Sequence, residues 1–598
     1  MISHWDSIFF LLTFVIVLVV GLYAGREEKT KEDYFLGGRS LPWWGVCGSL
    51  FGTNISANHI VGMLGIGFSV GFAQSHYEFG SIPAILLLAY VILPILRRKK
   101  FYTLSEFLSR RYGKISSNLY TIISLMLILI QLTGALYIGG RAFLPFAKQV
   151  SASIQYEHLV IIIAFTSTIY TWFGGLKSVV YTDVIQTVLI LISGIVLAYL
   201  AINRAEIGGL SGLMEKEMNS PHELSRMSIY LPANHEVLPW TGVLSGMFIL
   251  HIFYWNTNQY VVQRALGAVS LKEARLGIIA SGFLKLTVPF FSILTGVAAY
   301  HIWNHDGLVS AIDPDEAFSK LVIMIVPAGY GLIGFILAGL LGAIFSSIDS
   351  MLHSAATLFT IDIYLPLIKR IKYSGSKIPK EIEDFVSIKM GRWFIIFFAI
   401  LTTLLALIFF DPNSKSNFFI TLSSHSSNFT PGLLVVFIFG MFWNKSHPTS
   451  AWITILITPI LSYLAPAIYS YLFQDSLISE YFGNQLNFLH RVFLITIFSS
   501  IFHLLLSITL AKKIKKQDSN LDLQTNNFKV SLTHFIIIFY IFSILVGIYL
   551  KINFEVSGYL LFGFPLFASV AIGLYSRKID LFFSSVLFGI TAGLYFLF

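Results

Sequence analysis

The chain has 598 residues, of which 56% are hydrophobic and only 12% are Asp, Glu, Lys or Arg. A soluble domain carries about 25% charged residues, so this composition excludes a water-soluble globular protein and indicates that lipid is the main solvent. The single cysteine, Cys47, excludes an intramolecular disulfide and a cysteine cluster for a metal. The net charge of +9 would fit a nucleic-acid partner, but the placement of the basic residues argues against one.

About sixteen segments approach the roughly 20 apolar residues that cross a bilayer. The first is predicted to be a retained helix, because the start of the chain has no basic residues and no cleavage site of small residues follows. The ninth is predicted to be one long helix with an amphipathic prelude. The predicted spans lie near residues 6–24, 42–67, 73–96, 118–147, 157–174, 180–203, 240–263, 274–303, 322–368, 393–410, 417–443, 449–471, 492–511, 531–550, 555–575 and 579–597. The sequence therefore predicts an all-α polytopic membrane protein.

Most of the 40 Lys and Arg residues fall in alternate loops, which lie on one side of such a membrane protein. The loop after the third span carries seven basic residues between Arg97 and Lys114, and the loop after the seventh carries Arg264, Lys272 and Arg275. The positive-inside rule makes this side cytoplasmic and places both termini outside the cell. We therefore predict a multi-pass protein of the plasma (cell inner) membrane and no nucleic-acid partner.

Two predicted spans contain polar interruptions. Residues 51–59 of the second span read FGTNISANH, and residues 251–259 of the seventh read HIFYWNTNQ. Backbone leaves the helix at membrane depth only where it lines a cavity or is buried in protein. Two such segments, five spans apart and opposite in topology, indicate an inverted-repeat transporter with its site near the midplane. The alternative stays open that these small and polar residues only hold helices together.

The ninth span has a polar face suited to a cation. Ala343, Ser346 and Ser347 lie three and four residues apart and so share one side of the helix. Hydroxyls beside freed carbonyls make an oxygen-rich pocket, which suits a hard cation, and a neutral cage of this kind suits a monovalent one. In the alternative interpretation both hydroxyls bond to carbonyls of their own helix.

Four ionisable residues are predicted inside spans: Glu78, Asp183, Lys285 and Asp349. An ionisable group at the bilayer centre costs about 2.5–3.5 kcal/mol, so each is a functional hypothesis. A helix N-terminus would also explain Asp183, and a structural ion pair would explain Glu78 with Lys285. We find no H-E-x-x-H, Cys–His or G-x-S-x-G motif, so the sequence predicts no enzyme.

Several motifs then resemble one family. They include DYFLGGRSLPWW at 33–44, NISA at 54–57, TLSEF at 103–107, GGL at 174–176 ahead of YTD at 181–183, FTIDIY at 359–364 and GMFW at 440–443. In these segments the chain is similar to the sodium:solute symporter family, and within it to the sodium/glucose and sodium/galactose cotransporters. The resemblance extends from about residue 6 to about residue 510.

This resemblance implies a LeuT-type core of ten helices in two inverted five-helix repeats, with extra helices at both ends. The expected divisions are a retained helix at 1–30, the transport core at 40–445 and accessory helices at 446–598. The implied function is sodium-coupled symport of a small neutral solute, in the first place a monosaccharide, by alternating access. Inositol, a sialic-type sugar or a small carboxylate stay open as solutes, as does a non-transporting sensor or channel on the same fold.

The resemblance also assigns residues. The co-transported sodium ion would be held by the carbonyls of Gly52, Ile55 and Ala343 and the hydroxyls of Ser346 and Ser347. Some relatives hold a second sodium with an aspartate at the match to Asp183, and Ser346, Asp349 and Ser350 share one helix face, so a second site is predicted from Asp183, Ser346, Asp349 and Ser350. In the alternative interpretation Asp349 pairs with a neighbouring helix and Asp183 caps its own. The solute would meet Asn54, His59, Glu78, Ser81, His251, Tyr254, Trp255, Lys285 and Ser423, and the gate would consist of Met63, Tyr254 and Phe419.

Three of these positions depart from the bacterial galactose-type pattern, which has Gln, Asn and Gln where this chain has His59, His251 and Ser423. Each unpaired hydroxyl of a buried sugar costs about 1–3 kcal/mol, so these changes leave the identity of the solute open. We expect no arginine deep in the pore, with Arg141 near the external end of its helix. That expectation disfavours a carboxylate solute, which usually calls for a bidentate arginine.

Overall fold

The structure is a computed structural model that describes residues 2–511, apart from 27, 221–224, 376 and 412–417, and residues 565–566, 569–570 and 578–597. Within these ranges every regular element is a helix, which confirms the predicted all-α class. Nine of the described helical segments are long and apolar enough to cross a membrane, and one bent pair adds a tenth. Two of the predicted spans, 531–550 and 555–575, lie outside the described residues.

The first half of the chain forms two broken crossings and then two long helices, with further short helices around them. In chain order they are α1 (His4–Ala24), α2 (Lys31–Leu36), η1 (Gly37–Arg39), α3 (Trp43–Asn54), η2 (Asn58–Gly62), α4 (Met63–Ser69), η3 (Phe72–Ser75), α5 (His76–Phe79), α6 (Ile82–Leu87), η4 (Leu88–Ile92), α7 (Leu93–Arg98), α8 (Leu104–Tyr112), α9 (Lys114–Val150), α10 (Tyr156–Ile202) and α11 (Gly209–Asn219).

The second half repeats the pattern of broken and continuous crossings. Its helices are α12 (Trp240–Gly242), η5 (Val243–Met247), α13 (Phe248–Thr257), α14 (Gln259–Leu266), α15 (Leu271–Lys285), η6 (Pro289–Ile293), α16 (Leu294–His305), η7 (Val309–Ala311), η8 (Pro314–Glu316), α17 (Ala317–Ile325), α18 (Leu332–Leu358), η9 (Phe359–Tyr364), α19 (Leu365–Lys372), α20 (Lys380–Phe409), α21 (Phe418–Ser426), α22 (Thr430–Phe442), α23 (Pro448–Phe473), α24 (Leu477–Phe482), α25 (Phe488–Ala511) and α28 (Ile579–Leu597).

Both predicted helix breaks are confirmed. In the first, α3 ends at Asn54 and Ile55 takes an extended conformation, with φ −84° and ψ 92°. In the second, α13 ends at Thr257 and Asn258 is extended, with φ −89° and ψ 126°. The backbone groups freed at each break lie inside the protein, as they must at membrane depth.

Two expectations about helix limits need correction. The spans predicted at 157–174 and 180–203 form one helical run, α10, of 47 residues. At 1.5 Å per residue this run is about 70 Å long, more than twice the roughly 30 Å hydrocarbon core, so it still crosses twice. It turns at Gly175, whose φ of 49° and ψ of −160° favour glycine. The single helix predicted at 322–368 is instead divided into α17 and α18.

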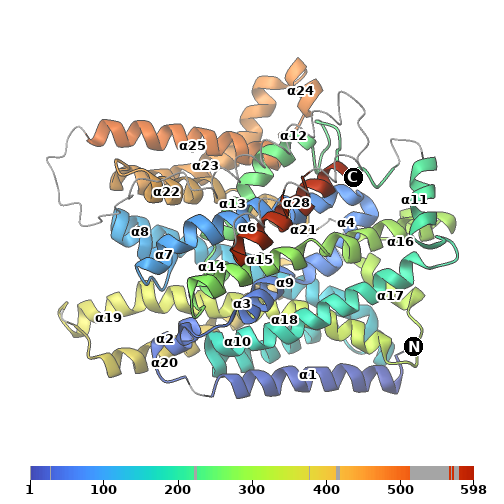
Figure 1. Ribbon diagram of the computed structural model, residues 1–598, viewed down its shortest axis with the longest axis horizontal. Helices are drawn as coiled ribbons and strands as arrows, with labels where there is room; N and C mark the ends of the chain where they lie inside the picture. Colours follow the sequence, from blue (N-terminus) through green and yellow to red (C-terminus); the bar gives the residue numbers. More distant parts are fainter. Residues whose placement is uncertain are drawn as a thin grey trace.

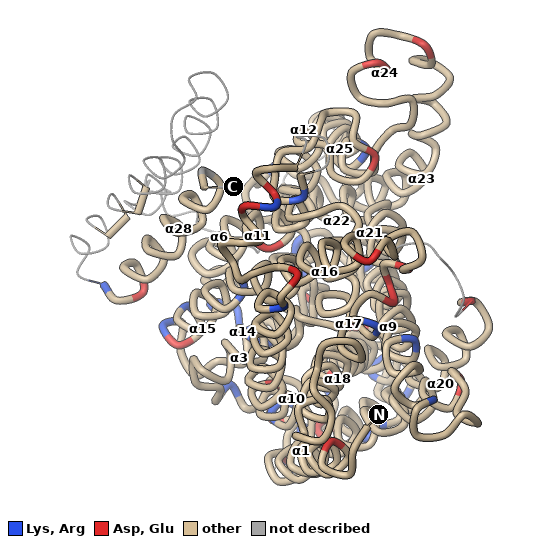
Figure 2. The backbone as a smooth tube through the Cα atoms, turned by 90° about the vertical axis from the view of Figure 1, so that its right-hand side faces the viewer, with Lys and Arg blue, Asp and Glu red and all other residues tan. Residues whose placement is uncertain are grey.

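The helices run mainly between two faces of the molecule (Figure 1). One face, which we call the basic face, carries α2, α7, α8 and α19, on the left of Figure 1. Arg39 ends η1 beside α2, Arg97 belongs to α7 and Lys100 follows α7. The opposite face carries α11 and both chain termini, and we call it the terminal face. Figure 2 looks onto this terminal face. The shared side of the two termini agrees with the topology expected from the basic loops.

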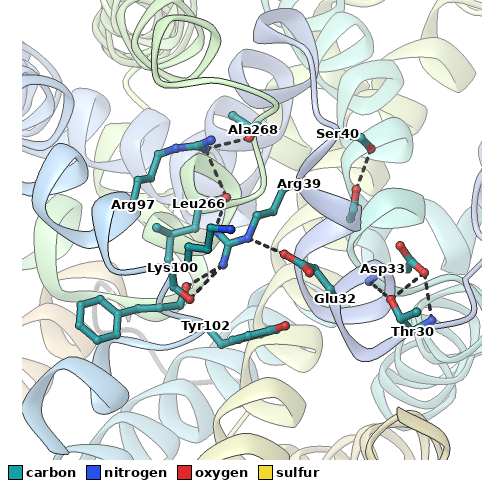
Figure 3. Close-up of polar contacts among 12 residues, drawn as sticks. Thr30, Glu32, Asp33, Arg39, Ser40, Arg97, Lys100, Tyr102, Leu266 and Ala268 are labelled. Atoms are coloured by element: carbon teal, nitrogen blue, oxygen red, sulfur yellow. Dashed lines mark hydrogen bonds and ion pairs between the residues drawn. The ribbon is translucent and has the colours of Figure 1, made fainter. Parts of the chain in front are cut away.

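At the basic face, the two broken helices are tied together (Figure 3). The backbone N–H of Leu41 donates to Gly267 O (3.1 Å), and that of Val269 donates to Leu41 O (3.0 Å). Arg39 donates to Glu32 and to the carbonyl of Leu266, and Arg97 donates to the carbonyls of Ala265, Leu266 and Ala268. The arginines thus satisfy carbonyls that the end of α14 leaves without helical partners.

On the terminal face, Glu217 of α11 holds the following loop. Its carboxylate accepts hydrogen bonds from Ser225 Oγ (3.0 Å) and from the backbone N–H of Arg226 (2.6 Å), and Oε1 lies 2.5 Å from His301 Nε2. Burial opposes ionisation, but these donors outweigh it and lower the pKa of Glu217 below its ordinary value of 4.5. Ionised Glu217 therefore adds stability above pH 4.5 that is lost as the pH falls through the lowered pKa.

We expect Glu217→Gln to lower the free energy of unfolding by about 1.5 kcal/mol at pH 7, because the charged acceptor is lost. The difference should shrink as the pH falls below 4.5, where the wild-type carboxylate also begins to lose its charge. Thermal unfolding in detergent at several pH values measures both effects. Glu215→Gln, an exposed residue of the same helix, is the matched control, and equal losses in the two variants would contradict the anchoring role of Glu217.

Candidate solute and cation sites

A cavity of about 200 Å³ lies at the first helix break. At about 30 Å³ per water molecule, this is the volume of roughly seven waters, which suits one small solute. Its wall combines the break between α3 and η2 with residues of α5, α9, α13, α18 and α21. The lining includes Thr53, Asn54, Ser56, Asn58, His59, Tyr77, Glu78, Gln131, His251, Tyr254, Trp255, Asn258, Tyr260, Lys285, Ser347, Phe419, Ser423, Ser426 and Ser427.

A charged cluster forms one side of this cavity. Lys285, the last residue of α15, places Nζ 2.6 Å from Glu78 Oε2 and 2.7 Å from Asn54 Oδ1. Glu78 is fully buried on the short helix α5, and its Oε1 has no hydrogen-bond partner among the described residues. His59 Nε2 lies 3.8 Å from that oxygen. The cluster therefore has no net charge when His59 is neutral, yet it keeps an acceptor free for a hydroxyl.

Aromatic side chains also line the cavity. Tyr254 OH accepts a hydrogen bond from Asn54 Nδ2 (3.2 Å), which ties this ring to the broken helix. Phe419 of α21 packs edge-on against Tyr77, with ring centroids 5.1 Å apart, and against His59 at 6.2 Å. A cavity lined by both polar groups and aromatic rings suits a solute that has both hydroxyls and C–H groups.

The structure brings most of the predicted solute residues together. Asn54, His59, Glu78, His251, Tyr254, Trp255, Lys285 and Ser423 line the cavity, as does Phe419 of the predicted gate. Two predicted residues lie outside the lining. Ser81 is buried and donates its hydroxyl to the carbonyl of Glu78 (2.6 Å), so its group is already used, and Met63 is buried in the core.

Sequence reasoning missed several lining residues, of which Gln131 and Tyr260 are the clearest. Gln131 reaches the cavity from α9 and accepts a hydrogen bond from Tyr260 OH (2.8 Å). Gln131 left a signal, because it is an uncharged polar residue near the end of the otherwise apolar run 125–132. Tyr260 left no such signal, because a tyrosine after a helix break is as common in packing as in the lining of a cavity.

The candidate sodium ligands meet beside this cavity. Ser346 Oγ donates to Gly52 O on α3 (2.8 Å) and to Ala343 O (3.2 Å), and Ser347 Oγ donates to Ala343 O (3.1 Å). Ile55 closes α3 with extended backbone, so its carbonyl leaves the helix direction. The hydroxyls thus do bond to their own helix, as in the alternative interpretation, but Ser346 also reaches across to the broken helix. Ser347 lines the solute cavity as well, so the two candidate sites share a wall.

We expect Ser347→Ala to raise the half-saturating sodium concentration about tenfold, equivalent to about 1.4 kcal/mol. The variant removes one hydroxyl oxygen from the candidate cation site, while the charged cluster that faces the solute is unchanged. Solute affinity at saturating sodium should therefore change much less. Initial uptake rates at varied sodium measure this, and an unchanged half-saturating sodium concentration would remove Ser347 from the ligand set.

The residues predicted for a second cation also lie close together. Ser49 Oγ donates to Asp183 Oδ2 (2.5 Å), Tyr170 OH donates to Asp349 Oδ2 (2.9 Å), and Thr53 and Ser350 share a hydrogen bond of 2.7 Å. The other oxygen of each carboxyl has no hydrogen-bond partner among the described residues. Two buried carboxyls with free oxygens repel each other unless a positive charge lies near.

One such charge is Arg264, and its position corrects an expectation. The sequence placed Arg264 in a basic loop, yet the side chain is fully buried on α14. It interacts electrostatically with both Asp183 and Asp349, and its Nε and Nη2 have no hydrogen-bond partner in the described part of the chain. Arg264 does not line the solute cavity, so the expectation of a cavity without arginine holds there.

Comparison with known proteins agrees with this arrangement. A family model described as the sodium:solute symporter family matches residues 34–457. The sodium/glucose cotransporter of Vibrio parahaemolyticus is 32% identical over 478 residues, which cover 75% of this chain and 82% of that protein. Human sodium/myo-inositol cotransporter 2 is 31% identical over 474 residues, which cover 75% of this chain and 67% of that protein.

The fold has a solved counterpart. The structure of a Na⁺-coupled sialic acid symporter in a substrate-bound outward-open state superimposes with a TM-score of 0.71 and 21% identity, covering 86% of this chain and 99% of that chain. This likeness confirms the expected LeuT-type fold. With the matched family and the multi-pass helical structure, it follows that this chain is a membrane transporter that belongs to the sodium:solute symporter family.

Proposed function

We propose that the solute carried with sodium is a small neutral polyhydroxylated molecule, in the first place a monosaccharide. The observation that carries this proposal is the neutral cluster of Glu78, Lys285 and Asn54, which lines the same cavity as Tyr254. A carboxylate accepts from a hydroxyl and an ammonium donates to one, so the pair matches adjacent hydroxyls. The ring of Tyr254 offers an apolar surface to the C–H face of a sugar.

A cyclic polyol such as myo-inositol is the second candidate. It presents hydroxyls of the same kind, and relatives named for myo-inositol match this chain almost as closely as the one named for glucose. His251 lines the cavity with Nε2 3.3 Å from the carbonyl of His76, so one ring nitrogen already has a partner. This leaves a wall with fewer free hydrogen-bonding groups than an amide would provide, which accommodates either solute.

Sodium coupling supplies enough energy for uphill uptake. One positive charge that crosses about 100 mV releases about 2.3 kcal/mol. A tenfold sodium gradient adds about 1.4 kcal/mol. The sum, about 3.7 kcal/mol, accumulates a neutral solute several hundred-fold for each sodium ion.

We also propose the orientation and organisation of the chain. The basic face would lie in the cytoplasm and the terminal face outside the cell, in the plasma (cell inner) membrane, because Arg39, Arg97 and Lys100 cluster on the basic face. Residues 1–30 would form a retained helix, 40–445 the transport core and 446–598 the accessory helices.

Uptake into proteoliposomes tests the proposal. We expect a sodium gradient to drive uphill accumulation of labelled D-glucose, D-galactose or myo-inositol, and a potassium gradient to drive none. Accumulation of N-acetylneuraminate instead would replace the neutral solute by an anionic one. Downhill flux alone would indicate a channel, and no flux with any of these solutes, in protein that binds sodium, would indicate a sensor.

A further inference from the structure

The accessory helix α25 reaches the wall of the solute cavity, although it lies outside the expected ten-helix core. Arg491, in its first turn, is only 7% exposed. Its Nη2 donates to the carbonyl of Ser424 (2.6 Å) and to Ser427 Oγ (2.8 Å). Ser427 lines the cavity, and Ser427 Oγ in turn donates to the same carbonyl of Ser424 (2.7 Å).

These contacts are made where a crossing bends. Phe419–Ser426 and Thr430–Phe442 form the bent pair, with an angle of 52° between them. In the last turn of α21 the carbonyls of Ser423, His425 and Ser426 accept backbone N–H groups, whereas that of Ser424 accepts from two side chains, Ser427 and Arg491. A guanidinium is well suited to a carbonyl at a helix end. The same short helix carries Phe419 and Ser423, both of which line the cavity. Arg491 therefore fixes the end of the helix that presents these two side chains.

The first turn of α25 also packs against a second wall of the cavity. A Cβ added to Gly246 of η5 would lie 1.8 Å from Leu489 O, and one added to Gly242 would lie 2.9 Å from Leu489 Cβ. Thr241 Oγ1 and His490 Nε2 are 2.7 Å apart. The helical segment that begins at Trp240 continues into α13, which carries His251, Tyr254 and Trp255. The approach leaves no space for a side chain, so α25 and this segment are packed backbone to backbone.

An apolar cluster completes the connection. Phe488 and Leu489 of α25 pack with Val243 and Met247, and Tyr77 and Ile420 pack against the same cluster. Tyr77 lines the solute cavity, and Ile420 lies on α21 next to Phe419. The first turn of α25 thus contacts two walls of the cavity on the side of the terminal face. One is the helical segment that continues into α13, and the other is the bent pair of α21 and α22.

We infer that residues 488–491 of α25 brace these two walls, and that Arg491 is a positioning residue which sets the place of α21 and so governs solute affinity and access from the terminal face. The inference rests on the proposed solute cavity. Arg491 touches no lining group except Ser427, so it acts through α21 and not by contact with the solute. Arg491 Nε has no hydrogen-bond partner among the described residues, so the guanidinium is held through Nη2.

Solute affinity gives the first test, with whichever of D-glucose or myo-inositol the wild type accumulates. We expect Arg491→Gln to raise the half-saturating solute concentration about tenfold, equivalent to about 1.4 kcal/mol, and to change the maximal rate at saturating sodium by much less. Arg491→Lys should recover part of the affinity, because an ammonium still donates to the carbonyl of Ser424. Arg111→Gln is the matched control, since Arg111 binds the carbonyls of Gly440, Trp443 and Asn444 at the far end of α22.

Cysteine labelling gives a second test that needs no solute. Cys47 is buried and is the only cysteine, so Ser423→Cys in a Cys47→Ser background reports on one site. We expect a membrane-impermeant thiol reagent, added on the terminal side, to label the introduced cysteine about threefold faster or more in Arg491→Gln, because α21 is then no longer held in place. Unchanged labelling and unchanged affinity in Arg491→Gln, at normal protein levels, would overturn the inference. No uptake of either solute by the wild type would count against the proposed solute, and the labelling result would still decide the role of Arg491.

Discussion

Lys285→Ala is expected to raise the half-saturating solute concentration more than a hundredfold, the largest loss of affinity that we expect from a single change. The variant leaves the Glu78 carboxylate buried without its partner, 2.6 Å away in the wild type, and also frees Asn54 Oδ1. Losing a hydrogen bond between a charged group and the solute costs about 1.5–3 kcal/mol, and Glu78 also loses the partner that holds it in place, so the two effects together amount to a factor of more than a hundred in affinity. Glu78→Gln should be less severe, because an amide still accepts a hydrogen bond from the ammonium.

Sodium-driven uptake at varied solute concentration measures these variants, together with the amount of protein in the membrane. Ser81→Ala is the matched control, because the Ser81 hydroxyl donates to the backbone carbonyl of Glu78 and the residue lies outside the cavity lining. If Lys285→Ala and Glu78→Gln lower only the amount of protein and leave apparent affinity unchanged, the pair is structural and does not bind the solute.

Asp183→Asn is expected to remove one sodium ion from each transport cycle. Asp183 and Asp349 each keep one carboxyl oxygen without a partner among the described residues, and Ser346 and Ser350 lie on the same helix face as Asp349. Each sodium ion contributes about 3.7 kcal/mol at 100 mV and a tenfold gradient, so the limiting accumulation ratio should fall several hundred-fold.

Reversal potentials at varied solute and sodium gradients measure the coupling ratio directly. A ratio of one sodium per solute in the wild type would remove the second site as a transported ion. An unchanged ratio in Asp183→Asn would exclude Asp183 from it even if two ions are carried. Asp362→Asn is the control, because this half-buried carboxylate accepts a hydrogen bond from Thr103 (2.8 Å) and lies outside both candidate sites.

Local signals predicted the breaks and the serine pair well. The residues around Ile55 and Asn258 are polar, whereas the sequence on either side is apolar. This contrast alone indicates where the helix is interrupted. The spacing of Ala343, Ser346 and Ser347 fixes their common face for any α-helix. These features depend on neighbours within about two turns, and the structure places them as expected.

Long-range contacts could not be predicted in the same way. Arg264 follows a helix break and precedes a glycine, so its surroundings in the sequence are those of a loop, and only packing against Asp183 and Asp349 explains its burial. The role of Ser81 likewise depends on a hydrogen bond to the backbone that no pattern shows. The contact of Arg491 with Ser427 joins residues 64 positions apart on separate helices, so nothing in the local sequence indicates it.

The ties at the basic face bear on how the cavity opens. Leu41 and Ala268 join the segments that border α3 and α14, and Arg39 and Arg97 hold the carbonyls at the end of α14. Two segments joined by paired backbone hydrogen bonds and by two guanidinium groups are expected to move together. α3 carries Gly52 and Asn54, and α14 carries Tyr260 and Arg264, so a joint movement of the two segments would displace walls of the solute and cation sites together. Release of cargo toward the basic face would then be simultaneous rather than stepwise.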